Sequence, residues 1–127
     1  MNLLLDTHVL LGSITSRRLS PAADAAFLDP RNALFLSAAS YWEICIKLSL
    51  GKLTLPGNWP EVIELARSVN DIRWLPIEPR HCRAVLELSH HHRDPFDRLL
   101  IAQARVEGLT LLSADPNLGR YGVPVVW

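Results

Sequence analysis

The sequence contains little cysteine. Its 127 residues include only two, Cys45 and Cys82, and they form no Cys-x-x-Cys pair. This count excludes a disulfide scaffold, and the spacing argues against a structural zinc site. We expect both cysteines to be small core residues of a reduced protein.

No charge sign dominates, and no long apolar run is present. Lys and Arg number 13, as do Asp and Glu, which excludes a polyanion binder that works by bulk charge but not a local nucleic-acid site. The longest stretch without a charged residue, Asn32–Trp42, is eleven residues long, too short for a transmembrane helix. Asp6 interrupts the apolar start, which argues against a signal peptide. We therefore expect a cytoplasmic protein that forms one domain, residues 1–127.

Three common catalytic motifs are missing as well. The sequence has no G-x-x-x-x-G-K-[ST], no G-x-G-x-x-G after its first apolar run and no G-x-S-x-G. These absences disfavour a P-loop nucleotidase, a dinucleotide-binding enzyme and a serine hydrolase, respectively.

Short apolar runs alternate with helical patterns along the chain. The runs predict buried strands at Leu3–Leu5, Ala33–Leu36, Ile72–Leu75, Leu109–Leu112 and Val123–Val126. One helix opens at Ser20-Pro21 and closes at Asp29-Pro30, and further helices are predicted at Ser37–Ser49, Asn58–Val69, Pro79–Ser89 and Pro95–Glu107. In the helix at Asn58–Val69, the predicted core side chains are Val62, Leu65, Ala66 and Val69. The alternation predicts a three-layer α/β domain with a parallel sheet.

Four acids stand at predicted strand ends or near predicted helix starts: Asp6, Glu43, Asp97 and Asp115. Taken singly, each is most simply a helix cap, since Ser40 to Glu43 matches a capping box and Asp94-Pro95 opens the helix that carries Asp97. In a parallel sheet, however, strand ends and helix starts meet at one edge. Carboxylates gathered there repel one another unless a divalent cation such as Mg²⁺ or Mn²⁺ binds them. The set therefore indicates metal-assisted chemistry on a phosphodiester.

Longer segments around these acids carry a family resemblance. They are Leu4-Leu5-Asp6-Thr7-His8, Tyr41-Trp42-Glu43-Ile44, the stretch from His92 to Ala104, Leu112-Ser113-Ala114-Asp115-Pro116 and Tyr121-Gly122-Val123-Pro124. In this order the chain resembles, over nearly its whole length, PIN-domain ribonucleases of the VapC-like toxin class. The segment from Asp94 to Ala104 is the most specific part.

The resemblance implies a five-stranded parallel sheet in the order 3-2-1-4-5 and an endoribonuclease that uses Mg²⁺ or Mn²⁺. It implies that Asp6, Glu43, Asp97 and Asp115 hold the metal, which activates water for in-line attack on an RNA phosphate. Thr7 and Ser113 match hydroxyl positions that support these acids. It also implies that the protein is the toxin of a toxin–antitoxin pair, forms a homodimer and is blocked by a cognate antitoxin protein.

Several basic residues permit two interpretations. Lys47 either pairs with Glu43 one turn away or contacts an RNA phosphate, and Arg98 beside Asp97 has the same two alternatives. The run His90-His91-His92 fits a solvated helix end better than a zinc site, because consecutive side chains diverge. His81 lies on an apolar stripe and is expected to be a hydrogen-bonded core histidine.

An apolar row beside the core stripe, made of Trp42, Ile46 and Leu50, predicts a dimer face or a groove for a partner peptide. Two other functions remain open at this point. The chain could be a non-catalytic binding module of the same fold whose acids are only caps, or an enzyme that acts on DNA or on small phosphoesters.

Overall fold

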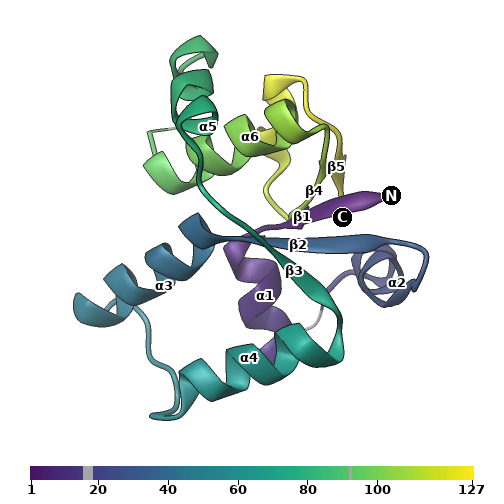
Figure 1. The fold of residues 1–127 in the computed structure, drawn as a ribbon, viewed down its shortest axis with the longest axis vertical. Coiled ribbons are helices and arrows are strands. Elements are labelled where there is room, and N and C mark those ends of the chain that lie inside the picture. The colour runs from purple at the N-terminus through teal and green to yellow at the C-terminus, as the bar shows by residue number, and fades with distance from the viewer. Residues whose placement is uncertain (16–18, 92) are drawn as a thin grey trace.

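The computed structural model describes residues 1–15, 19–91 and 93–127. Within them lies a parallel sheet of five strands in the order β3-β2-β1-β4-β5 (Figure 1). The strands are β1 (Asn2–Leu5), β2 (Ala33–Ser37), β3 (Ile72–Leu75), β4 (Thr110–Leu112) and β5 (Val125–Val126). The predicted strand order is confirmed. The order reverses between β1 and β4, which places a topological switch point at the carboxyl ends of these two strands.

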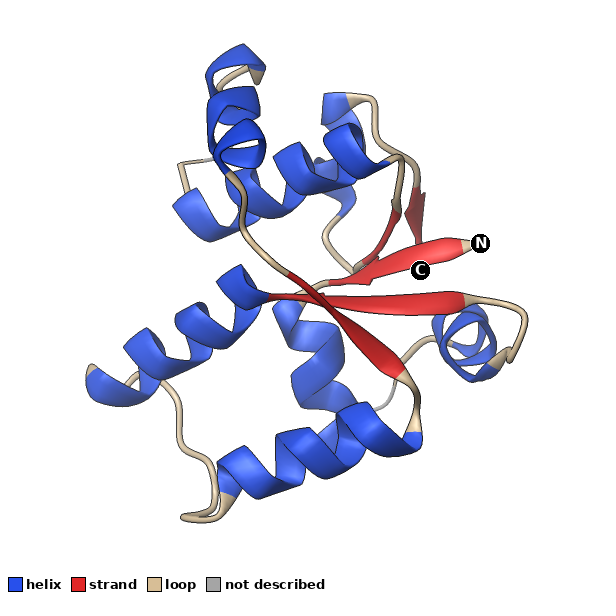
Figure 2. Cartoon of the chain, in the orientation of Figure 1, coloured by secondary structure: helices blue, strands red, loops and turns tan. Residues whose placement is uncertain are grey.

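Helices cover both faces of the sheet, as predicted (Figure 2). They are α1 (Thr7–Ile14), α2 (Pro21–Leu28), α3 (Ala38–Ser49), α4 (Trp59–Val69), α5 (Pro79–Ala84) and α6 (Pro95–Glu107), with 3-10 turns η1 (Val85–Glu87) and η2 (Pro116–Tyr121). The helices α5 and α6 lie over one face, and α1, α2 and α4 lie over the other. None of the helices in the described ranges has the length and apolar character needed to cross a bilayer.

The central strand β1 shows why two helical layers form. Leu3 and Leu5 point into a core shared with Val9 of α1, whereas Leu4 points into the core beneath α6. All three leucines are fully buried, and each contributes roughly 1.5–3 kcal/mol by leaving water. A strand that is apolar on both faces must be covered on both faces.

The bounds of α6 agree with the prediction because strong local signals set both ends. Asp94 caps the helix by accepting from the backbone nitrogens of Phe96 (2.8 Å) and Asp97 (3.3 Å), and Pro95 occupies the first helical position. Gly108 ends it in the left-handed conformation at φ 66°. This cap fixes the place of Asp97 in the first turn.

The predicted capping box at Ser40 is wrong. Ser37 is the N-cap of α3, and its hydroxyl accepts from the backbone nitrogen of Ala39 at 3.0 Å. Ser40 is buried inside the helix. The strand β2 runs directly into the helix, so the cap falls on the last strand residue, one turn earlier than the sequence pattern indicated.

Other local predictions are also wrong. In α4, Ile63 is buried, whereas Leu65 and Val69 are 65% and 72% exposed. The helix predicted at Pro79–Ser89 ends as α5 at Ala84 and continues as the 3-10 turn η1. Cys82 is exposed and Cys45 is only partly buried, so neither is a core residue.

Candidate functional site

Asp6 sits at the carboxyl end of β1, where the sheet reverses its order. Its backbone nitrogen donates to the carbonyl of Leu112 in β4 at 3.0 Å, and its side chain is the N-cap of α1. The carboxylate Oδ1 accepts from the backbone nitrogen of His8 at 3.2 Å, and Oδ2 accepts from the hydroxyl of Ser113 at 2.6 Å. Asp6 is therefore both a helix cap and a buried carboxylate held in one orientation, so the cap interpretation does not exclude a functional one.

Glu43 lies in the second turn of α3 and is almost fully buried, with 3% of its surface exposed. Its Oε1 accepts from the hydroxyl of Thr7 at 2.7 Å, and its Oε2 lies 2.5 Å from the ammonium nitrogen of Lys47. The hydrogen bond to Glu43 raises the pKa of Lys47; burial opposes this effect, and the charges of Glu43, Asp94 and Asp97 add to it. A buried carboxylate is costly without a positive partner, and Lys47 supplies that charge.

Asp115 and Asp97 approach this edge from β4 and α6. Asp115 caps η2 by accepting from the backbone nitrogen of Asn117 at 2.9 Å. Its own backbone nitrogen donates to the hydroxyl of Ser113 at 3.1 Å, so Ser113 connects Asp115 to Asp6. Asp97 is partly exposed and lies within electrostatic reach of Lys47.

The structure thus brings six of the eight predicted residues together as two hydrogen-bonded groups at one edge, and Asp97 and Arg98 belong to neither group. One group joins Asp6, Ser113 and Asp115, and the other joins Thr7, Glu43 and Lys47. In the described part of the chain, no three of the four acids have ligand atoms within 4.8 Å of one another. Their oxygens are the hard donors that suit Mg²⁺ or Mn²⁺, and the two ordered, buried carboxylates fit such an ion.

A cleft of about 570 Å³ opens beside Thr7 and Lys47. Two further ionisable residues that line it, His8 and Lys52, were not among the predicted site residues. Lys52 follows α3 in the chain, and its backbone nitrogen bonds the carbonyl of Lys47 at 2.9 Å, which places both lysines near the same opening. The sequence separation of five residues gave no periodic signal for this pairing.

Arg98 occupies a structural position. It is 9% exposed, and its guanidinium donates to the carbonyls of Ser89 (2.8 Å) and Val85 (3.3 Å). These bonds hold the η1 segment against the start of α6. This supporting role differs from both alternatives that the sequence offered for Arg98, an ion pair with Asp97 and a contact with an RNA phosphate.

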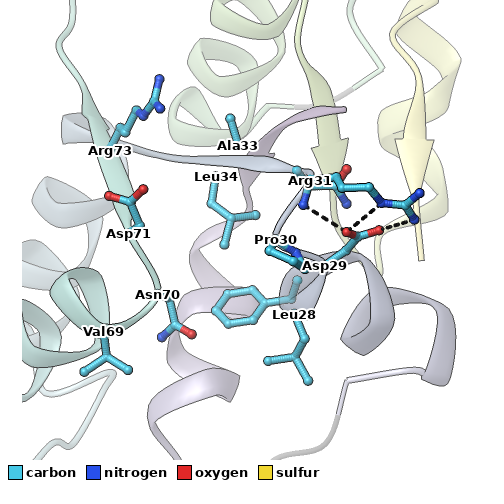
Figure 3. A pocket seen from close by; sticks show the side chains of 12 residues that line it. Leu28, Asp29, Pro30, Arg31, Ala33, Leu34, Val69, Asn70, Asp71 and Arg73 are labelled. Atoms are coloured by element: carbon cyan, nitrogen blue, oxygen red, sulfur yellow. Dashed lines mark hydrogen bonds and ion pairs between the residues drawn. The ribbon is translucent and has the colours of Figure 1, made fainter.

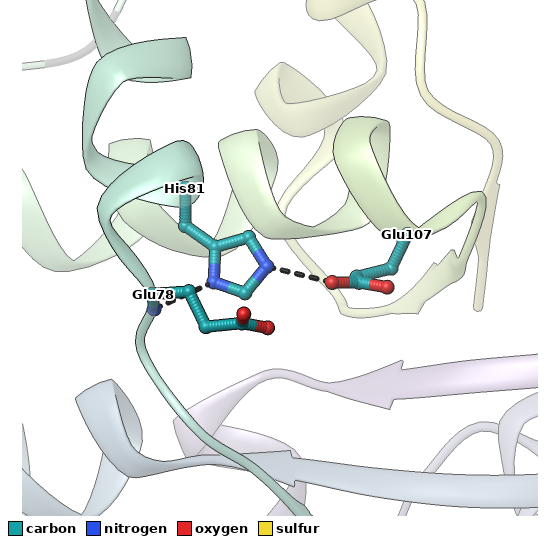
Figure 4. A group of neighbouring side chains, drawn as sticks. All are labelled: Glu78, His81 and Glu107. Carbon is teal, nitrogen blue, oxygen red and sulfur yellow. Dashed lines mark hydrogen bonds and ion pairs between the residues drawn. The ribbon is translucent and has the colours of Figure 1, made fainter.

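A second group of ionisable side chains joins α5 to α6. Ligand atoms of Glu78, His81 and Glu107 lie within 4.8 Å of one another (Figure 4). His81 is fully buried and hydrogen-bonded, as predicted: its Nδ1 accepts from the backbone nitrogen of Glu78 at 3.0 Å, and its Nε2 lies 2.7 Å from Oε1 of Glu107. Because a backbone N–H can only donate, Nδ1 carries no hydrogen and the neutral ring keeps its hydrogen on Nε2. That hydrogen blocks the nitrogen a metal would need, so we interpret this group as a structural link.

The guanidinium of Arg80 supports the same interpretation. It forms ion pairs with both carboxylates of this group, those of Glu78 and Glu107. A cation would therefore have to compete with Arg80 for the same oxygens.

The histidine run contributes little in the described residues. His90 and His91 are exposed, and the ring of His91 contacts Tyr121 with centroids 5.1 Å apart. His92 lies outside the described residues.

The opposite edge of the sheet carries a pocket of about 450 Å³, lined by the loops before β2 and β3 (Figure 3). There Asp29 accepts two bonds from the guanidinium of Arg31, and these bonds, with one from the Arg31 backbone, lower the pKa of Asp29 to about 2. None of the four predicted acids lines this pocket, and none lines the cleft beside Lys47. We place the candidate site at the carboxyl edge because Ser113 and Thr7 hold Asp6 and Glu43 there, and Thr7 and Lys47 also line the cleft.

Several solved structures share this fold. VapBC2 from Rickettsia felis, solved bound to a DNA fragment from its promoter, aligns at a TM-score of 0.76 and 15% identity, covering 98% of this chain and 97% of that chain. VapBC-1 from nontypeable Haemophilus influenzae aligns at 0.66 and 16%, covering 98% and 96%. FitAcB from Neisseria gonorrhoeae aligns at 0.64 and 19%, covering 97% and 95%. At these identities the likeness establishes the fold.

No curated protein matches the sequence significantly. The sequence profile of the PIN domain matches residues 3–124, which include all four acids and every described strand except β5 and the first residue of β1. Sequence profile, strand order and structural neighbours agree: the chain belongs to the PIN domain family.

Proposed function

We propose that this protein is a metal-dependent endoribonuclease and the toxin of a toxin–antitoxin pair. The observation that carries the nuclease assignment is the pair of buried carboxylates, Asp6 and Glu43, at the switch point of the sheet. Each has its orientation fixed by a hydroxyl, Ser113 and Thr7 respectively. Caps need no such support, and burying two carboxylates at one edge costs folding energy. A bound cation would compensate this cost by neutralising the buried charges.

Asp6, Glu43, Asp97 and Asp115 would hold Mg²⁺ or Mn²⁺. Such an ion supplies positive charge that activates water and offsets the charge developing on a phosphate. Membership of the PIN family, whose members are typically nucleases, supports this choice of chemistry.

The chain's own residues have distinct parts in this proposal. Thr7 and Ser113 keep one oxygen of each buried carboxylate engaged and so limit rotation of the carboxylates. Lys47, whose side chain is 33% exposed at the mouth of the cleft, neutralises Glu43 and can also meet an RNA phosphate. Lys52 on the same cleft extends the positive charge along the backbone of the substrate.

The decisive experiment is cleavage of mixed labelled RNAs by the purified protein with Mg²⁺, with Mn²⁺ and with EDTA. Asp97→Asn should abolish cutting while circular dichroism shows a folded protein. Asp24→Asn is the matched control, because Asp24 is an exposed acid in the first turn of another helix that starts with proline. It should leave cutting unchanged.

Other results would select the alternatives. Cutting of DNA, or of small phosphoesters in preference to RNA, would change the substrate. A folded protein that cuts nothing and binds neither metal in a titration would favour the non-catalytic binding module.

The toxin role is supported by the VapBC and FitAB structures that share the fold. Expression of the wild-type chain should arrest bacterial growth, and Asp97→Asn should not. Leu50, at the end of the apolar row of Trp42, Ile46 and Leu50, is 62% exposed. This exposed apolar side chain supports a contact with a second copy of the chain or with an antitoxin. Leu50→Lys should weaken that assembly, as measured by light scattering.

A further inference from the structure

Trp42 and Phe96 form an aromatic pair between α3 and α6. Their ring centroids lie 5.2 Å apart at an interplanar angle of 75°. Each ring directly precedes one of the four acids, since Trp42 adjoins Glu43 and Phe96 adjoins Asp97. The pair therefore lies at the border of the candidate site, where the two helices that carry these acids meet.

The contact with Phe96 leaves much of the surface of Trp42 exposed. The residue is 56% exposed, and α3 is anchored to the core by other side chains, Ala39 and Ile44 among them. Trp42 also lines an open, mainly apolar depression of about 520 Å³, together with Tyr41 and Trp74. A large aromatic surface thus faces solvent beside the carboxylates of the candidate site. This arrangement favours binding of a flat, partly apolar group.

We propose that Trp42 stacks on an unpaired base of the RNA next to the phosphate that is cut, with Phe96 holding the indole in place. This inference rests on the proposed nuclease function and names the part of the substrate that the site reads. Aromatic side chains bind unpaired bases of single-stranded RNA by stacking, with little dependence on base identity. We therefore expect a preference for single strands rather than for one sequence.

Helix geometry places the contacts proposed for base and phosphate on either side of Glu43. Successive residues of a helix point about 100° apart, so Trp42 lies about 100° round the axis on one side of Glu43, and Lys47, four residues on, lies about 40° on its other side. Leu50, which we assign to protein contacts, is eight residues from Trp42, about 12 Å along the helix axis. The RNA and protein contacts of the row thus fall at its opposite ends.

The test compares Trp42→Ala, Trp42→Leu and Trp42→Phe in cleavage of a single-stranded RNA. Trp42→Ala and Trp42→Leu should raise KM about 10-fold with a smaller effect on kcat, and Trp42→Phe should stay near the wild type. Leu28→Ala is the control, because Leu28 is also an exposed apolar residue (63%) but lines the pocket at the opposite edge of the sheet. An RNA that is abasic beside the cut site should remove the difference between wild type and Trp42→Ala.

Three outcomes would overturn the proposal. Trp42→Leu could match the wild type, which would mean that apolar character alone suffices. The abasic RNA could preserve the difference between the proteins. Trp42→Ala could change the molecular mass in light scattering, which would assign Trp42 to a protein interface instead.

Failure of the nuclease function can be told apart from failure of this inference. If the wild type cuts no RNA, anisotropy of a labelled single-stranded RNA in EDTA still measures stacking. Weaker binding by Trp42→Ala, but not by Trp42→Phe, would support the aromatic contact in a protein without nuclease activity. Equal binding by all variants would refute it.

Discussion

The hydroxyl of Thr7 donates to Oε1 of Glu43 at 2.7 Å across the interior of the protein. This bond joins the first residue of α1 to α3, two elements that are 36 residues apart in the chain. Since Thr7 follows Asp6 directly, the same bond fixes the distance between the two buried carboxylates. Much of the order at the candidate site depends on this one hydroxyl.

Replacing Thr7 with valine, which has a similar shape, should therefore destabilise the fold. The change leaves a buried carboxylate oxygen without its donor, at a cost of about 1–3 kcal/mol. Urea unfolding would measure this loss. Thr7→Ser keeps the hydroxyl and serves as the control, so equal stability of the valine and serine variants would contradict the assigned role.

Lys47 provides the second prediction, because it neutralises Glu43 where we place the metal. Lys47→Met should lower the melting temperature in EDTA, since the nearly buried carboxylate of Glu43 loses its positive partner. Adding Mn²⁺ should then raise the melting temperature more in Lys47→Met than in the wild type, because the ion no longer competes with the ammonium group and binding to the folded state stabilises it.

Lys52→Met is the control for this experiment, because Lys52 lines the same cleft. Its response to Mn²⁺ should equal that of the wild type. The same enhanced response in both lysine variants would show a general effect of charge rather than relief of Glu43.

The ion pair of Asp29 and Arg31 predicts a pH effect at the opposite edge. In the folded protein the pKa of Asp29 is lowered from 3.8 to about 2, chiefly by its side-chain hydrogen bond to Arg31. A lowered carboxyl pKa contributes stability that is present above pH 3.8 and is lost as the pH falls towards 2. In Arg31→Gln, an NMR titration should find the pKa of Asp29 raised but still below 3.8, because the backbone bond from residue 31 remains, whereas Arg73→Gln, on the wall of the same pocket, should leave it near 2.

Parts of this fold could be predicted from the sequence because local signals were strong. Asp94-Pro95 and Gly108 define both ends of α6, and Ser20-Pro21 opens α2 where predicted. Alternating apolar runs likewise indicated every strand, although β5 begins at Val125 rather than Val123. In each case the deciding interactions lie within a few residues.

The features that were not predicted from the sequence depend on contacts between distant segments. The helix α1 could not be predicted as a separate element, because its first turn is anchored by Asp6 at a strand end rather than by an amphipathic pattern. In α4, the spacing of the exposed Leu65 and Val69 fits a buried helical stripe as well as that of the buried Ile63 does. Only packing against the sheet determines which of these side chains are buried. Only the resemblance implied that Thr7 and Ser113 support the acids, since partners 36 and 107 positions apart give no local signal.

The link between His81 and Glu107 yields a last prediction, which separates a structural role from a metal site. If Nδ1 accepts from the backbone nitrogen of Glu78, the ring must carry its hydrogen on Nε2 and donate it to Glu107. A ¹⁵N NMR spectrum should then show an unprotonated Nδ1 and a protonated Nε2, and added Zn²⁺ should leave both signals in place. Glu107→Gln should preserve this tautomer, because the amide oxygen can accept the same bond, whereas a Zn²⁺-dependent shift at Nε2 that disappears in Glu107→Gln would make this group a metal site.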